Sequence, residues 1–358
     1  MLKEFYRQAH VAFLSRHIDL AMDGRTPTFE LWFIGHKKLS AAYWTVGALF
    51  LLSAEERIPR EALIEWVLQC QHESGGFGGD VRQDPHLLFT LSAVQILAML
   101  DALHRVDRDH IARYVASLQR KDGSFCGDAW GEVDTRFSYA AALCLSILRG
   151  ASEGSVAGGC AAPLATLPYV DVPAMVDFVM RCENFDGGFG LVPGAESHAG
   201  QIFCCVGTLA LCGALHRLRD GGDALGLWLA ARQMHSGGFN GRPDKLHDVC
   251  YSWWVFSALA MIGRTHWVDA AALEQFILSC QDELLLGAHP ANGISDSAPG
   301  GIADRPGDQP DAFHTFFGIT GLALMGKHGI GPIDPAYALP MSVVQRLRES
   351  NVQNKESD

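Results

Sequence analysis

The residue types best suited to chemistry gather in the stretch 241–254 and at one later position. Asp248 and Cys250 flank a single residue, and His314 follows further along the chain. A carboxylate, a thiol and an imidazole can together bind one zinc ion and leave its fourth position open, as in catalytic zinc sites. Taken singly, they would be explained as a helix cap, a buried thiol and a hydrogen-bonded histidine. Together they predict a zinc site that binds a substrate thiol as the nucleophilic thiolate.

Cationic residues lie beside this predicted metal site. Arg242 and Lys245 come just before it and Tyr251 just after it, while Arg136 and His198 open apolar segments earlier in the chain. Arginine makes planar bidentate contacts and lysine supplies a point charge, so the set suits a leaving diphosphate. Stabilising the charge on that group would be the main catalytic contribution. Lys245 alone has a simpler explanation as ordinary surface charge.

Aromatic residues recur in the apolar segments that follow these positions. In a solid helical core they would only pack, but around a hollow they would line a pocket for a lipid chain. The residues concerned are Trp44, Phe89, Tyr139, Phe203, Trp253, Trp254 and Phe313. A metal, a cationic site and an aromatic pocket together favour an enzyme that joins a lipid diphosphate to a thiol.

The elements that must position these residues come from a repeated unit. A glycine-rich turn occurs five times, at 75–80, 122–128, 186–190, 236–241 and, in a weaker form, 300–304. The intervals between its Phe or Ile positions are 48, 64, 50 and 63 residues. The two longer intervals contain apparent insertions at 152–168 and 284–299, so the underlying period is near 48.

Each unit shows an amphipathic segment, the glycine turn, an acidic residue and then a strongly apolar segment. An acidic residue suits the first turn of a helix, and a helix that is apolar on most faces is normally buried. Two helices per repeat, one amphipathic and one buried, predict an all-α fold closed into a double-layer α/α toroid. Polar residues at the starts of the inner helices would converge on one mouth. The residues at these equivalent positions are His86, Arg136, His198, Cys250 and His314.

The bulk composition limits the classes of function. The chain has 358 residues, 48% apolar and 19% charged, which is enough to bury a sizeable core, and its net charge of −12 argues against a nucleic-acid partner. No apolar signal segment opens the chain, and apolar runs such as 43–52 fall short of the ~20 residues that span a bilayer. We therefore expect a soluble cytoplasmic protein. Most of the ten cysteines lie in apolar segments without a Cys-x-x-Cys pair, which indicates buried free thiols.

These motifs resemble the β subunits of protein prenyltransferases. The resemblance covers nearly the whole chain and rests on the Gly-Gly-Phe repeats, the Gly-Arg-Pro-x-Lys run from Gly241, the Asp-x-Cys-Tyr-Ser-x-Trp run from Asp248, and the late Asp-x-x-His. It implies one toroid domain over 1–340, built from prenyltransferase-type repeats, with a C-terminal tail at 341–358. It also implies a zinc ion, an isoprenoid diphosphate and a helical α subunit as partner.

Among these enzymes the chain looks most like the β subunit of Rab geranylgeranyltransferase, the type II class. The run 300–308, the double Trp at 253–254 and the short tail carry this similarity. By resemblance, Asp248, Cys250 and His314 are the zinc ligands. The positions that match diphosphate contacts are His198, Arg242, Lys245 and Tyr251.

The resemblance also suggests a magnesium position and a lipid pocket. Asp304 falls where farnesyltransferases carry an aspartate linked to magnesium use. Ser40 matches a position that is small in the Rab enzyme and bulky in farnesyltransferase, which would leave room for a twenty-carbon chain. Trp44, Leu91 and Tyr139 would line the same pocket. Three departures from the family pattern are the insertion at 284–299, Ile302 in place of Phe, and His247 in place of Pro.

The implied reaction is transfer of geranylgeranyl from geranylgeranyl diphosphate to C-terminal cysteine thiols of Rab GTPases through a zinc-bound thiolate. A Rab escort protein would present the Rab. The alternatives are a farnesyl or type I geranylgeranyl β subunit acting on Cys-a-a-X peptides, and a non-catalytic barrel used for lipid or protein binding. A terpene cyclase is disfavoured because the chain has no Asp-x-Asp-Asp motif.

Overall fold

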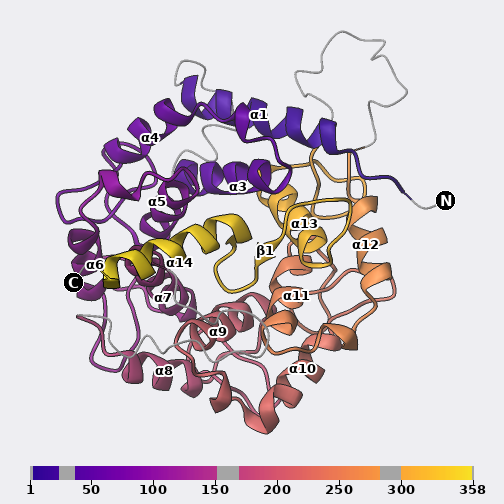
Figure 1. The fold of residues 1–358 in the computed structure, drawn as a ribbon. Helices are drawn as coiled ribbons and strands as arrows, with labels where there is room; N and C mark the ends of the chain where they lie inside the picture. The colour runs from indigo at the N-terminus through magenta and orange to yellow at the C-terminus, as the bar shows by residue number, and fades with distance from the viewer. Residues whose placement is uncertain (1–2, 24–36, 151–168, 283–299, 357–358) are drawn as a thin grey trace.

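The inner layer of the structure is a closed ring of apolar helices. The computed structural model describes residues 3–23, 37–150, 169–282 and 300–356; the predicted insertions 152–168 and 284–299 lie outside them. Each inner helix packs on the next, and the last packs on the first (Figure 1). These helices are α3 (Lys38–Leu51), α5 (Leu87–Met99), α7 (Thr135–Arg149), α9 (Ala199–Leu211), α11 (Tyr251–Met261) and α13 (Ala312–Leu324).

A second ring of helices surrounds the first and shields it from solvent. Its members are α1 (Arg7–Asp23), α4 (Arg60–Gln69), α6 (Arg108–Ser117), α8 (Val172–Arg181), α10 (Asp223–Ala230) and α12 (Ala270–Ser279). The predicted all-α toroid with two concentric layers is therefore confirmed. The described residues contain six helix pairs, one more than the five glycine turns indicate, because α1 and α3 pair without a Gly-Gly-Phe turn between them.

The glycine turns join the outer helices other than α1 to their inner partners at one end of the toroid. Their aromatic positions, among them Phe77 and Phe239, are fully buried, which explains why the turns carry a large apolar residue. The glycines allow close approach: a Cβ at Gly123, whose φ is +87°, would lie 1.9 Å from the carbonyl oxygen of Ala174 on the next outer helix. Such a turn requires glycine both for its left-handed backbone and for space.

The inner helices begin with different capping residues. Asp134 and Asp311 cap α7 and α13 with their side chains, as expected for an acidic residue at a helix start. At α5 and α9 the cap is a histidine: the Nδ1 atoms of His86 and His198 accept the amide protons of Leu88 and Gly200. Helix α11 starts after Cys250, which makes no side-chain cap bond, but the carboxylate of Asp248 accepts from the amide of Cys250 at 2.8 Å. The expected acidic residue at the helix start is therefore wrong only for α5 and α9.

Short 3₁₀ helices lie at the other end of the toroid, where most inner helices finish. They are η2 (Glu55–Arg57), η3 (Leu103–Arg105), η4 (Leu215–Arg217), η5 (Arg219–Gly222) and η6 (Thr265–Trp267). Among the described residues, no helix is long and apolar enough to span a membrane. The cysteines described are unpaired, and all but Cys126 are buried, as the sequence indicates for most of them.

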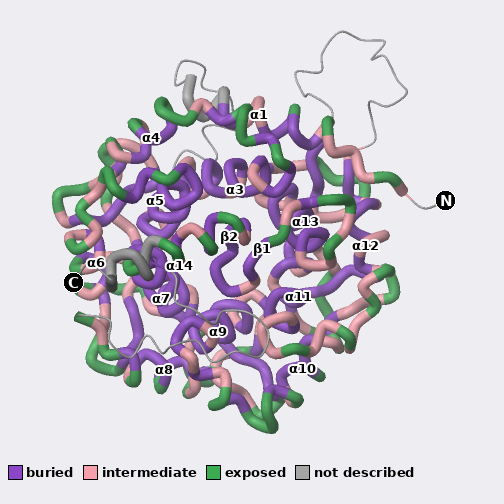
Figure 2. The backbone as a smooth tube through the Cα atoms, in the orientation of Figure 1, coloured by how far each residue is buried: buried purple, intermediate pink, exposed green. Residues whose placement is uncertain are grey.

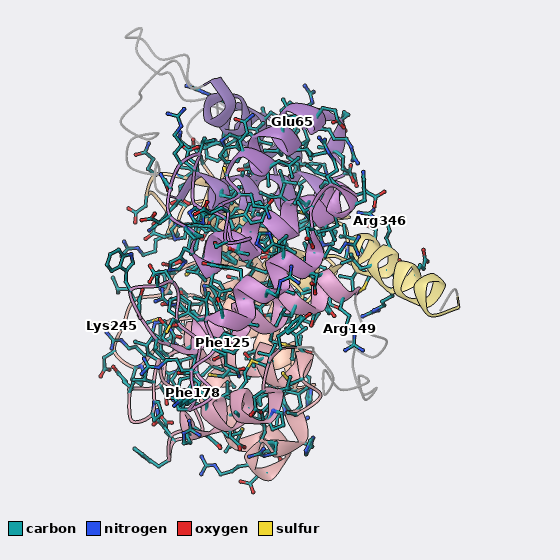
Figure 3. The ribbon with its side chains drawn as sticks, turned by 90° about the vertical axis from the view of Figure 1, so that its left-hand side faces the viewer. Glu65, Phe125, Arg149, Phe178, Lys245 and Arg346 are labelled. Atoms are coloured by element: carbon teal, nitrogen blue, oxygen red, sulfur yellow. The ribbon has the colours of Figure 1, made fainter. Side chains whose placement is uncertain are left out.

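The C-terminal segment closes the end of the toroid opposite the glycine turns. The strands β1 (Ile333–Asp334) and β2 (Leu339–Pro340) form a hairpin near the ring axis, and helix α14 (Met341–Glu356) crosses the end (Figures 1 and 2). The segment treated as a tail in the sequence is thus a helix, with Val343 and Val344 buried in the core. Figure 3 shows Lys245 at one end of the molecule and Arg346 of α14 at the other.

Candidate metal centre and active site

Two neighbouring inner helices bring three possible metal ligands together. Cys250 directly precedes α11, Asp248 lies two residues earlier, and His314 is in the first turn of α13. One ligand atom from each residue lies within 4.8 Å of the others, and this is the only such cluster among the residues described. Cys250 is buried and the other two are half-buried. The arrangement suits one metal ion with an open fourth position.

His314 is held by carboxylates on both sides of its ring. Its Nδ1 lies 2.7 Å from an oxygen of Asp311, and its Nε2 lies 3.5 Å from Oδ1 of Asp248. Burial by itself would lower the pKa of His314, but these two carboxylates raise it to about 10. In turn, the pKa of Asp248 is lowered despite burial, because His314 and the amide of Cys250 donate to its carboxylate. The centre therefore attracts positive charge.

The chemistry of these donors fits a metal ion. Nε2 of His314 faces Asp248, so it is the ring nitrogen available as a ligand, while Asp311 orients the ring through Nδ1. A carboxylate behind a metal-binding histidine is the usual second layer of such a centre. Asp311 was not singled out in the sequence as a site residue. Its spacing of three residues before His314, at a helix start, is the signal that could have identified it.

Orientation by Asp311 leads to a testable prediction. Asp311→Asn will keep the helix cap, since asparagine also caps helices, but it will lose the anionic partner of His314. We expect zinc affinity to fall about 10- to 100-fold, measured by competition with a chromophoric chelator. Asp269 is the matched control, because it caps α12 by accepting from Ala272 without contacting a metal ligand. Equal losses for Asp311→Asn and Asp269→Asn would contradict this role.

A histidine–tyrosine pair lies next to the metal centre. The Nε2 of His198 lies 3.3 Å from the hydroxyl of Tyr251. Burial and the nearby Arg242 cation lower the pKa of His198, and its Nδ1 accepts from Gly200, so the neutral ring carries its proton on Nε2. Gly241 leaves space for this pair, since a Cβ there would lie 2.2 Å from the Tyr251 hydroxyl. His198 therefore donates from Nε2 to the oxygen of Tyr251, which leaves the Tyr251 O–H as the donor of the pair for a ligand.

The predicted cationic residues differ in their ion-pair partners and in their exposure to solvent. Arg242 forms an ion pair with Glu196, and Lys245 is exposed on the same loop. Arg136, at the start of α7, is bound by the buried carboxylate of Asp134, with Nη2 at 2.5 Å, and by Glu132. Arg242 thus lies near the His198–Tyr251 pair, whereas Arg136 is already engaged by two acids one helix further round the ring.

Asp304 lies close to the metal centre without joining its cluster. Its backbone oxygen accepts from the amide of Val249, which is between two of the metal ligands, at 2.9 Å. Its carboxylate pairs with Arg305 at 3.2 Å. As an oxygen donor it could contribute to magnesium only together with other oxygen ligands, such as phosphate oxygens and water.

Aromatic rings from neighbouring inner helices form a continuous chain of contacts, which we call the aromatic wall. Successive ring centroids are 4.4–5.0 Å apart, in the order Trp44, Phe313, Phe317, Trp254, Phe203 and Tyr139. Trp44, Trp254 and Phe313 are partly exposed, but Trp253 is fully buried and stands behind Phe203. Phe317 was missed in the sequence, although it follows Phe313 at the spacing of one helical turn.

The remaining predicted pocket residues lie on α3, α5 and α7. The hydroxyl of Ser40 is 3.2 Å from that of Ser92, and Leu91 next to Ser92 is almost fully buried. The Tyr139 hydroxyl donates to the backbone oxygen of Ala336 in the closing hairpin segment at 2.8 Å. Tyr139 is therefore fixed at both ends, by the hairpin segment and by Phe203.

The toroid is typical of a known class of protein. A family model described as the prenyltransferase alpha-alpha toroid domain matches residues 5–339, so the chain belongs to the prenyltransferase toroid family. It is 49% identical to geranylgeranyl transferase type-2 subunit beta 1 of Arabidopsis thaliana, over 92% of each chain. It is 43% identical to geranylgeranyl transferase type-2 subunit beta of Saccharomyces cerevisiae, over 93% of this chain and 95% of that protein.

A solved structure supports the same architecture. Candida albicans protein geranylgeranyltransferase-I, complexed with GGPP, superposes with a TM-score of 0.79 over 97% of this chain and 99% of that one. The two sequences are 22% identical, so this likeness shows the fold alone. Together with the family match, it confirms the resemblance to prenyltransferase β subunits that the repeats and motifs indicate.

Proposed function

We propose that this chain is the catalytic β subunit of a Rab (type II) geranylgeranyltransferase, which transfers geranylgeranyl from geranylgeranyl diphosphate to C-terminal cysteines of Rab GTPases. The cluster of Asp248, Cys250 and His314, beside the His198–Tyr251 pair, carries this proposal. The two type-2 relatives, similar along more than nine-tenths of the chain, support the type II class. Zinc is the metal that best suits one oxygen, one sulfur and one nitrogen ligand.

The residues of the site would have two roles: some would be metal ligands, and others would stabilise the negative charge on the diphosphate. When bound, zinc would lower the pKa of an acceptor cysteine so that the thiolate attacks C1 of the lipid diphosphate. Asp248, Cys250 and His314 would hold the ion, and Asp311 would keep Nε2 of His314 turned towards it. The bond from C1 to the diphosphate oxygen breaks as the new carbon–sulfur bond forms, so charge develops on the departing diphosphate.

Donors at the mouth would stabilise that charge. Tyr251 would offer its O–H, and His198 would exchange the bond from its Nε2 to the Tyr251 oxygen for one to a phosphate oxygen. Arg242 would exchange its exposed partner Glu196 for phosphate oxygens, and Lys245 is free to approach from solvent. Magnesium bound to the diphosphate, with Asp304 nearby, remains a prediction. Preorganised donors of this kind typically contribute two to three orders of magnitude each, roughly.

The aromatic wall would contact the isoprenoid chain. Its partly exposed members, Trp44, Trp254 and Phe313, offer apolar surface on adjacent inner helices. Trp253, which is fully buried next to Phe203, would not touch the lipid directly. A helical α subunit and an escort protein that presents the Rab would complete the active complex; these partners and a cytoplasmic location remain predictions.

The type II proposal is tested by acceptor choice. This chain, copurified with its α subunit and supplied with geranylgeranyl diphosphate, would be offered an escorted Rab and a Cys-a-a-X peptide side by side. Transfer to the escorted Rab alone supports type II. Transfer to the free peptide would assign the chain to the type I or farnesyl class, and transfer to neither would favour a non-catalytic barrel.

Zinc binding should release protons. Burial raises the pKa of the Cys250 thiol well above its usual value, and the paired carboxylates raise that of His314 to about 10 against the effect of burial. Both groups therefore carry protons in the metal-free protein at pH 7, and both must lose them to bind zinc. Affinity should rise with pH, about tenfold per pH unit for each proton released.

Calorimetry can count these protons. Titrating zinc into the metal-free complex in buffers of different ionisation enthalpy should show close to two protons released per ion at pH 7. The Cys212→Ala variant provides the control, because it removes a buried thiol at the C-terminal end of α9 that is not a metal ligand, and the count of two protons should not change. A zinc affinity that does not change between pH 6 and pH 8 would contradict the protonation states assigned here.

A further inference from the structure

Each glycine turn packs against the start of the next outer helix, and we call each such contact a seam. A Cβ built on the seam glycine would lie within 3 Å of the backbone of one residue on that helix. The five described seams pair Gly75 with His110, Gly123 with Ala174, Gly187 with Ala224, Gly237 with Ala272, and Gly300 with Ala9. The last seam joins the final glycine turn to α1 and so closes the outer ring.

One position differs in the ring-closing seam. The residue after each contact point is apolar and at most 2% exposed in the other four seams, namely Ile111, Met175, Leu225 and Leu273. In the closing seam this residue is His10, which is also fully buried. A buried histidine in place of an aliphatic side chain requires hydrogen-bond partners to offset the lost hydration.

Both ring nitrogens of His10 have partners. Its Nδ1 accepts from the amide of Gly301 at 3.0 Å, so its Nε2 carries the proton and donates to Oε1 of Gln281 at 2.8 Å. Burial lowers the pKa of His10 to about 4, which keeps the ring neutral. Gln281 also bridges the backbone of Glu4 and Tyr6, so the start of the chain is bound to the last glycine turn.

The bond from Gly301 to His10 corresponds to a bond that two of the other four glycine turns make internally. In the turns of Asp122 and Asp186 the matching amide, that of Ser124 or Gly188, donates to the aspartate two residues earlier. The residue two before Gly301 is Pro299, which has no carboxylate. His10 therefore supplies, from the opposite end of the chain, the acceptor that the last glycine turn lacks.

The segment that follows Gly301 holds both sides of the metal centre. The amide of Ile302 donates to the hydroxyl of Thr315, next to His314, at 2.8 Å. The backbone oxygen of Asp304 accepts from Val249, between Asp248 and Cys250, at 2.9 Å. Four residues thus connect the His10 bond to the helix starts that carry the three metal ligands.

We propose that His10 is a positioning residue for the metal centre, which couples closure of the ring by α1 to zinc binding. By fixing Gly301, it sets the path of residues 301–304 and with it the separation of the Asp248–Cys250 turn from His314. Coupling of this kind is reciprocal: zinc must stabilise the closed seam as much as the closed seam favours zinc. The inference rests on the zinc site of the proposed function, but not on its lipid or its acceptor.

Zinc affinity of the complex with the α subunit provides the first test. His10→Leu installs the aliphatic residue found in the other seams, and Gln281→Ala removes the partner of His10. Each should raise the Kd for Zn²⁺ about tenfold, the lower end of the effect of outer-layer residues. Gln119→Ala is the matched control, since Gln119 bridges the backbone of Asp171 in the same way in a seam far from the metal.

The outcomes separate this inference from the proposed function. Wild-type zinc affinity in His10→Leu, or an equal loss in Gln119→Ala, would overturn the positioning role. A wild-type complex that binds no zinc would overturn the proposed function and this inference with it.

Hydrogen exchange on the wild-type complex tests the coupling without any variant. Adding Zn²⁺ to metal-free protein should slow exchange of the Gly301 amide and of α1, and leave the seam of Gly123 and α8 unchanged. Exchange in α1 that is the same with and without zinc would refute the coupling.

Discussion

Replacing Cys250 with alanine will remove both stable zinc binding and prenyl transfer. The thiol is the only sulfur in the cluster with Asp248 and His314, and it comes from the residue that directly precedes α11. Without it only one carboxylate and one imidazole remain, and catalytic zinc sites normally have three protein ligands. Zinc contributes several kcal/mol of activation by generating the thiolate, so transfer should fall by roughly three orders of magnitude or more.

The measurement is single-turnover transfer from geranylgeranyl diphosphate to an escorted Rab, with zinc content determined on the same sample. Cys212→Ala is the matched control: Cys212 is a buried thiol at the C-terminal end of α9, far from the mouth. It should keep zinc and activity while losing a similar amount of buried surface. Full activity of a zinc-free Cys250→Ala protein would refute the metal mechanism.

The fold could be predicted because each repeat needs glycine and apolar residues at fixed positions, and these residues are visible in the sequence. Glycines at positions such as Gly123 have no substitute, since a Cβ would collide with the next outer helix. Apolar inner helices, such as Leu87–Met99, have no polar face and must be buried. These two constraints recur at a fixed period, so two layers and closure of the ring follow from them.

The first and last elements could not be predicted in the same way. The pairing of α1 with α3 uses no Gly-Gly-Phe turn, and its closing bond joins His10 to Gly301 across almost the whole chain. Helix α14 has few apolar residues, and its place is set by contacts such as that of Arg346 with the Ala98 carbonyl oxygen at 2.6 Å. Contacts between residues so far apart in sequence leave no periodic pattern.

For the candidate site, the sequence showed which residues could be metal ligands, but it did not show how their side chains are oriented. Asp248 and Cys250 directly precede α11 and His314 is in the first turn of the neighbouring inner helix α13, so the closed ring brings them together. The proton on Nε2 of His198 depends on the amide of Gly200, and the ring of His314 depends on Asp311; both follow only from hydrogen bonds in three dimensions. Likewise the burial of Trp253 behind Phe203 depends on how α9 and α11 pack.

Donor length provides the second large prediction. Ser40 lies one turn before Trp44 on α3, and its hydroxyl meets that of Ser92 on α5. If this small residue leaves room for the last isoprene unit, Ser40→Trp will exclude a twenty-carbon donor and still admit a fifteen-carbon one. Burying five carbons contributes about 4 kcal/mol at ~0.8 kcal/mol per carbon. Discrimination should therefore shift by roughly two to three orders of magnitude in favour of farnesyl diphosphate.

Competition between the two diphosphates in one reaction measures this shift directly as a ratio of kcat/KM values. Ser92→Ala serves as the control, because it breaks the Ser40–Ser92 hydrogen bond without adding volume, and it should leave the donor ratio within a few-fold of wild type. Zinc affinity should be unchanged in both variants, since neither α3 nor α5 carries any of the three ligands. If Ser40→Trp lowers the use of both donors equally, the added indole has disturbed the helix layer, and Ser40 does not determine the length of the lipid that is accepted. If only the longer donor is lost, the final isoprene unit of that donor lies in the space beside Ser40.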